Sequence, residues 1–140
     1  MGGRAVKSTL TPEAKRVYEI ALKVRRRLSA GQSPVDHCDL WSAILWQQLA
    51  AEGHAVRLIS GHVHVLDPED LLGHIWIETP LNGVPWVIDI SADQFNGQGL
   101  PDYPTVLVVP ASAASHHVRG HVMTRSLGMA ILREAREYGL

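Results

Sequence analysis

The dipeptide Asn82-Gly83 stands between two apolar runs, GHIWIETPL and VPWVIDI, and constrains the fold of this chain more than any other feature. An Asn-Gly pair in that setting is the strongest short-range signal for a β-hairpin, because both residues tolerate the positive φ that a two-residue turn requires. The pair therefore predicts two antiparallel strands, over about 74–79 and 84–90.

The register of this hairpin brings a histidine and an acid to one face. It places Trp76 opposite Asp89 and His74 opposite Ser91, so His74 and Asp89 become diagonal neighbours about 7–8 Å apart. An acid inside an apolar run is costly unless it is paired, and a carboxylate beside an imidazole favours the charged ring. Two opposed prolines weaken the ladder beside the turn, and a shift by one residue would separate the pair. The other face is apolar and predicts the core side, with Ile75, Ile77, Trp86, Ile88 and Ile90.

The remaining chain predicts three helices and two more strands. Thr11-Pro12-Glu13 is typical of a helix start, and Gly61 interrupts a strand pattern as a bulge or bend does. Residues 1–10 are expected to form a flexible lead to a single domain. The expected helices run over about 11–28, from about 36 or 38 to 52, and over about 122–138. The expected strands run over about 56–65, 74–79, 84–90 and 105–109. This order favours an α+β fold with a largely antiparallel sheet.

Composition narrows the classes of function. Hydrophobic residues make up 46% and charged residues 19% of the 140 positions, which is typical of one globular domain. A formal net charge of −1 predicts no binding to nucleic acid. The run Arg25 to Arg27 is interpreted as a solvated helix face. With no apolar run long enough for a membrane span and no signal-peptide pattern, we expect a cytoplasmic protein without membrane partners.

Cys38 is the sole cysteine of the sequence, so no internal disulfide is expected. It falls in the first turn of the second expected helix, where the helix dipole stabilises a thiolate, although the nearby acids Asp36 and Asp39 oppose that effect. A neighbouring histidine would lower the thiol pKa further. Backbone N–H groups at the helix start and the side-chain amide of Gln32 are candidate donors to an oxyanion.

The order of Cys38 at a helix start, His74 at a strand start and Asp89 on the next strand resembles the papain-like cysteine protease superfamily. The run Ser91–Phe95, SADQF, makes the chain similar to the transglutaminase-like branch, in particular to small bacterial Cys-His-Asp proteins. Gln32 resembles the oxyanion-hole glutamine of papain-like enzymes. The resemblance covers about residues 32–109 and implies a Cys-bearing helix packed on an antiparallel sheet, with helices flanking it at both ends.

The resemblance also implies a chemistry, acyl transfer through a thioester. Cys38 would be the nucleophile, His74 the general base and acid, and Asp89 the residue that orients His74, with Gln32 at the oxyanion. The substrate would be an amide of a peptide or protein, and no cofactor or metal is required. The residues expected in the substrate cleft are Trp76 and Gln94.

Two other functions stay open from the sequence. One is a catalytically inactive binding module or inhibitor of the same fold. The other is a zinc-dependent hydrolase that uses His62 and His64, which share a strand face, together with His74. The histidines within 116–121 are interpreted as part of a surface loop before the last helix. The sequence does not separate hydrolysis from transfer or deamidation, and it does not give the oligomeric state.

Overall fold

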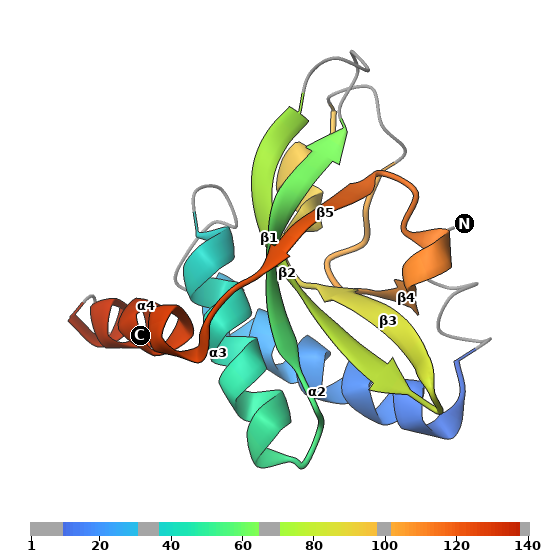
Figure 1. The fold of residues 1–140 in the computed structure, drawn as a ribbon, viewed down its shortest axis with the longest axis horizontal. Coiled ribbons are helices and arrows are strands. Elements are labelled where there is room, and N and C mark those ends of the chain that lie inside the picture. The colour runs from blue at the N-terminus through green and yellow to red at the C-terminus, as the bar shows by residue number, and fades with distance from the viewer. Residues whose placement is uncertain (1–9, 31–36, 65–70, 98–101, 138–140) are drawn as a thin grey trace.

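The computed structural model describes residues 10–30, 37–64, 71–97 and 102–137, and forms an α+β fold (Figure 1). The α-helices are α2 (Pro12–Ser29), α3 (Cys38–Ala51) and α4 (Arg125–Glu137). The strands are β1 (Arg57–His64), β2 (Leu71–Leu81), β3 (Val84–Asp89), β4 (Leu107–Pro110) and β5 (His117–Val122). Two 3₁₀ helices, η1 (Ala92–Phe95) and η2 (Ala111–Ala113), follow β3 and β4. The expected flexible lead, apart from Leu10, lies outside the described residues.

The sheet is antiparallel throughout, in the order β4-β3-β2-β1-β5. The hairpin prediction is confirmed in its register, with pairs running from Leu81 and Val84 at the turn to Ile77 and Ile88. Asn82 has a φ of 54° and Gly83 a φ of 78°, as a two-residue turn of this kind requires. The opposed prolines do not break the ladder, and both strands keep the predicted pairing.

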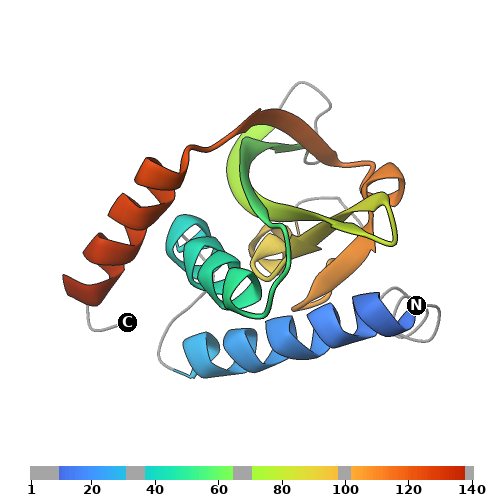
Figure 2. The ribbon, with the colours of Figure 1, turned by 60° about the horizontal axis from the view of Figure 1, so that its bottom comes forward.

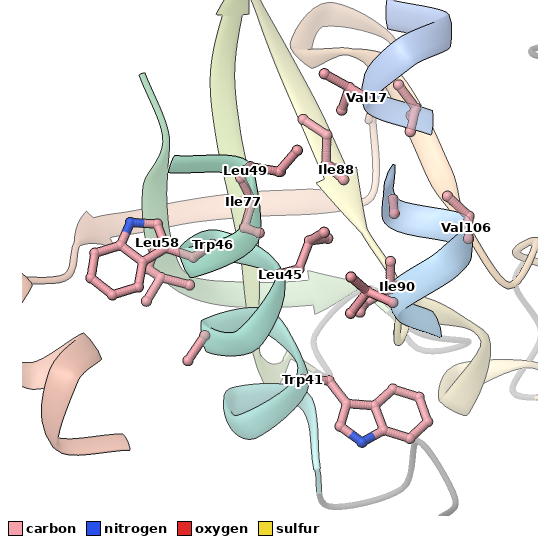
Figure 3. Packing of buried hydrophobic residues seen from close by; sticks show 14 of the residues in the cluster. Val17, Trp41, Leu45, Trp46, Leu49, Leu58, Ile77, Ile88, Ile90 and Val106 are labelled. Atoms are coloured by element: carbon pink, nitrogen blue, oxygen red, sulfur yellow. The ribbon is translucent and has the colours of Figure 1, made fainter. Parts of the chain in front are cut away.

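The helices cover one face of the sheet. Thr11 caps α2 by accepting a hydrogen bond from the Ala14 N–H at 3.2 Å, as the sequence predicted. Helix α3 lies between α2 and α4 and rests on the sheet (Figure 2). Its Leu45 and Leu49 pack toward Ile77 and Ile88 of the hairpin in the main core (Figure 3). This arrangement confirms the apolar hairpin face as the core side.

The opposite hairpin face, which carries His74 and Asp89, also has a small core of its own. Its buried apolar residues are Ile59, Trp76, Val87, Leu107 and Val109, with Tyr103, Ala111 and Ala114 packed against them. His74 is therefore only 2% exposed and Asp89 only 1%. Because these two groups lie under a second apolar layer, their electrostatic interaction is only weakly screened by water.

The interpretation of residues 116–121 as a surface loop was wrong, because the segment forms β5 at the edge of the sheet. Strand β5 pairs with β1, and the register shifts between Ser60 and Gly61, which confirms that Gly61 interrupts the regular strand pattern, as expected of a bulge or bend. A Cβ atom on Gly61 would meet the Val118 carbonyl oxygen, and one on Gly120 would meet the Ser60 carbonyl oxygen. These two glycines let β5 approach β1 closely. Because β5 extends to Val122, helix α4 starts at Arg125, later than expected.

The basic run on α2 is also not a uniformly solvated face. Arg26 and Arg27 are exposed, but Arg25 is only 8% exposed. Its guanidinium donates to both carboxylate oxygens of Asp93, at 2.7 and 2.9 Å, and lies 5.1 Å from the ring centroid of Trp41. Arg25 therefore ties α2 to η1, the turn that directly follows β3.

Candidate functional site

Asp89 is the centre of a buried hydrogen-bond network at the end of β3. Its Oδ2 accepts from Nε2 of His74 at 2.7 Å and from Nε2 of His117 at 2.8 Å. Its Oδ1 accepts from the backbone N–H of Ser91 at 2.9 Å and from the Ser91 hydroxyl at 3.4 Å. Burial by itself would raise the pKa of Asp89, but the charge of His74 and the hydrogen bonds from both histidines outweigh burial and hold the pKa well below its usual range. The carboxylate is therefore ionised, and both of its oxygens accept hydrogen bonds.

His74 is held in one orientation by this carboxylate and by two aromatic rings. Its ring lies 5.9 Å from that of Trp76 in a stacked contact and 5.0 Å from that of Phe95 in an edge contact. Because Nε2 is bound to Asp89, Nδ1 is the ring nitrogen left for other partners, and it lies 3.4 Å from Nε2 of Gln94.

Cys38, the first residue of α3, is the other partner of His74. Burial would lower the pKa of His74, but the charge and hydrogen bond of Asp89, with the hydrogen bond and charge of Cys38, raise it to about 10. The side chain of Cys38 is partly exposed. Helix α3 is fixed beside β2 by a 3.0 Å hydrogen bond from the Ser42 hydroxyl to the Ile75 carbonyl, one residue after His74. The fold therefore aligns a thiol, an imidazole and a carboxylate.

The thiol and the imidazole open into a cleft of about 560 Å³. Its walls come from the start of α3, from β1, β2 and β5, and from Gln94 on η1. The lining residues are Cys38, Asp39, Ser60, Gly61, His62, Gly73, His74, Ile75, Gln94, Gly120 and His121. Asp89 and His117 do not line the cleft, and the side chain of His74 is buried, so a ligand there meets the partly exposed thiol while the imidazole and the carboxylate lie beneath the surface.

Within the described ranges, one group of side chains has the spacing of a metal site: His74, Asp89 and His117, whose ligand atoms lie within 4.8 Å of one another. It differs from the trio expected for zinc, since His62 is an exposed residue of the cleft wall and His64 lies outside the cleft and the group. The Nε2–Oδ2 distances of 2.7 and 2.8 Å are hydrogen-bond lengths, which need a hydrogen on each Nε2. A metal would need those nitrogens bare. The geometry fits hydrogen bonding better.

The structure brings together most of the residues singled out from the sequence. Cys38, His74 and Asp89 form one chain of contacts, and Gln94 lies in the cleft as expected. Trp76 is 1% exposed and packs beside His74, so it supports the imidazole instead of lining the cleft. The expected oxyanion donor Gln32 lies outside the described residues.

His117 is the site residue that the sequence did not reveal. The run HHVRGHV contains a weak signal for a strand, because its residues can alternate between two faces. Its polar composition favoured a loop instead. Only the pairing of β5 with β1 brings His117 to Asp89.

Comparisons with protein-family models, with curated proteins and with solved structures found no match for this chain. The fold itself is a small α+β domain with a five-stranded antiparallel sheet. In the part of the chain that the structure describes, no helix is both long and apolar enough to cross a membrane.

Proposed function

We propose that this protein is a thiol-dependent acyl-transfer enzyme that acts on an amide of a peptide or protein. The observation that carries the proposal is the position of His74, which hydrogen-bonds Asp89 through Nε2 and contacts Cys38 at the mouth of an open cleft. A nucleophile, a base and a group that orients the base are the parts that covalent acyl transfer requires. The proposal includes a papain-like, transglutaminase-like fold, which the same order of residues in the sequence supports.

The first half of the reaction makes a thioester. The raised pKa of His74 favours the imidazolium, which forms an ion pair with the Cys38 sulfur when that sulfur attacks as the nucleophile. The thiolate attacks the carbonyl carbon of the amide, and the carbonyl π electrons move to oxygen. When the tetrahedral intermediate collapses, the C–N bond breaks and His74 gives its proton to the departing nitrogen. The amine leaves, and the acyl group stays on Cys38.

The second half releases the acyl group. Water or an amine attacks the thioester while neutral His74 takes its proton, and the C–S bond breaks to return the thiolate. The product is a carboxylic acid with water or a new amide with an amine. Asp89 stays ionised throughout and stabilises the imidazolium. The N–H of Cys38, at the start of helix α3, and the amide of Gln32 would bind the oxyanion.

The cleft is compatible with an amide substrate. The partly exposed thiol of Cys38 lines it, and another lining residue, Gly73, has open space where a Cβ would stand, which lets an extended backbone approach closely. Gln94 reaches the same Nδ1 that faces the thiol, so its amide is placed to contact the atoms around the reacting carbonyl.

The test offers wild-type protein, Cys38→Ala and His74→Ala the same substrates, casein and a glutamine-containing peptide, with and without hydroxylamine. New amino termini report peptide cleavage, released ammonia reports attack on the glutamine amide, and hydroxamate reports transfer. We expect one of these products from the wild type and a rate at least about a hundredfold lower in both variants. Equal product from Cys38→Ala, or none of the three products from wild type, would contradict the proposal and favour the binding module.

A further inference from the structure

His117 has no part in the reaction as written, although it binds the same oxygen as His74. Its Nε2 lies 2.8 Å from Oδ2 of Asp89, and its side chain is only 2% exposed. It comes from β5, at the edge of the sheet, and lies opposite Val63 of β1. Burying a polar ring costs free energy unless the ring is hydrogen-bonded, and the bond to Asp89 offsets that cost for His117.

The ring of His117 is fixed by its surroundings. It meets Trp76 edge-on at 4.9 Å between centroids and Tyr103 edge-on at 5.8 Å. Its backbone is held by the pairing of β5 with β1, including a 3.0 Å bond from the His64 N–H to the His116 carbonyl.

The tautomer of His117 follows from its contacts. An ionised carboxylate only accepts hydrogen bonds, so Nε2 must carry a hydrogen. The other nitrogen, Nδ1, is buried and has no hydrogen-bond partner among the described residues. The ring therefore presents one fixed N–H, aimed at Oδ2 of Asp89.

We propose that His117 is a positioning residue, which holds the Asp89 carboxylate in the rotation that His74 needs. The Ser91 N–H and hydroxyl bind Oδ1, and His74 and His117 share Oδ2, so each carboxylate oxygen is held by two donors. Without the fixed donor, Oδ2 is restrained only by His74, the ring that the carboxylate is meant to orient. The effect on Cys38 is indirect, because His117 does not line the cleft. This role rests on the proposed function.

The test uses two amide substitutions of different reach. In His117→Gln the amide nitrogen takes the place of Nε2 and restores the donor, whereas the shorter His117→Asn cannot reach Oδ2. The readout is alkylation of Cys38 by iodoacetamide at about pH 6, where an ordinary thiol of pKa about 8.5 is almost wholly protonated. We expect His117→Asn to react about tenfold more slowly than wild type and His117→Gln to stay within about threefold of it. Circular dichroism confirms that each variant is folded.

His74→Ala is run in parallel and separates the two proposals. If His74→Ala reacts as fast as wild type, the proposed function fails. If His74→Ala is slow but His117→Asn reacts at the wild-type rate, only the role of His117 is overturned. A long-range proton–nitrogen NMR spectrum of the wild-type protein gives an answer that does not depend on any variant folding. The hydrogen of His117 on Nε2 supports the proposal, and a hydrogen on Nδ1 alone refutes it.

Discussion

Arg25 gives the sharpest test of how the site is anchored, because it is the buried member of an otherwise exposed basic run. Its guanidinium makes two bonds to Asp93 and donates to the carbonyl oxygens of Ile90 at 2.9 Å and Thr105 at 3.2 Å. These contacts join α2 to the segment that carries Gln94. We predict that Arg25→Met destabilises the fold and loosens this segment.

The expected loss of stability in Arg25→Met follows from the charge of Asp93, which the substitution leaves without its partner. Removing one partner of a buried ion pair typically costs about 3–5 kcal/mol, because the other charge stays buried. The Asp93 side chain is 14% exposed, so hydration relieves part of that cost and about 3 kcal/mol is expected. Methionine keeps much of the apolar stem that packs near Trp41. The neighbouring Arg26 is exposed, so Arg26→Met should change the free energy of unfolding by less than about 0.5 kcal/mol.

Urea denaturation of the two variants measures this difference. Adding Asp93→Asn removes the stranded charge, so Arg25→Met combined with Asp93→Asn should cost less than the sum of the two single changes. If Arg25→Met is no more harmful than Arg26→Met, or if the two changes at 25 and 93 add independently, the anchoring role is refuted.

Three further results are expected. Because the folded pKa of His74 is raised from 6.5 to about 10, its contribution to stability is complete below about pH 6.5 and is lost as the pH rises toward 10. The free energy of unfolding, measured with urea, should therefore fall by up to about 1.4 kcal/mol per pH unit in that window. If the variant His74→Gln lacks this slope, the slope is assigned to His74. Gly61→Ala should lower the free energy of unfolding by about 2 kcal/mol, because the new Cβ would lie 2.5 Å from the Trp76 ring. In the control Gly73→Ala the new Cβ meets nothing within 4 Å, so the free energy of unfolding should stay close to that of wild type. Equal effects of the two substitutions would count against the close contact of β1 with β5. Elemental analysis should find no stoichiometric zinc in purified protein. If the wild type instead holds one zinc per chain and His117→Gln holds none, the metal site is favoured.

The hairpin and its register were predictable because the information is local. Asn82 and Gly83 fix the turn, and the alternation of the strands then decides which side chains share a face. The pairing of His74 with Asp89 follows from that register, since each lies only a few residues from the turn. The helical pattern also predicted that α3 begins at about residue 36 or 38, and the helix begins at Cys38.

The parts that the sequence did not predict depend on contacts between distant segments. His117 reaches Asp89 only because β5 adds to the edge of β1, and the polar run around it has no strong strand signal. Arg25 looks like its exposed neighbours in the sequence, and only the structure shows that it is buried and bonded to Asp93 of η1. The second core around Trp76 was missed because it needs side chains from outside the hairpin, namely Leu107 and Val109 of β4 with Tyr103 packed against them.

The most direct test of the central claim is the rate of Cys38 alkylation by iodoacetamide from about pH 4 to about pH 10, in wild type and in His74→Ala. Since Cys38 is the sole cysteine, the signal has one source. A thiolate–imidazolium pair predicts fast alkylation below pH 7 that slows strongly when His74 is removed. A profile that rises only near the ordinary thiol pKa of about 8.5, unchanged in His74→Ala, would contradict the account.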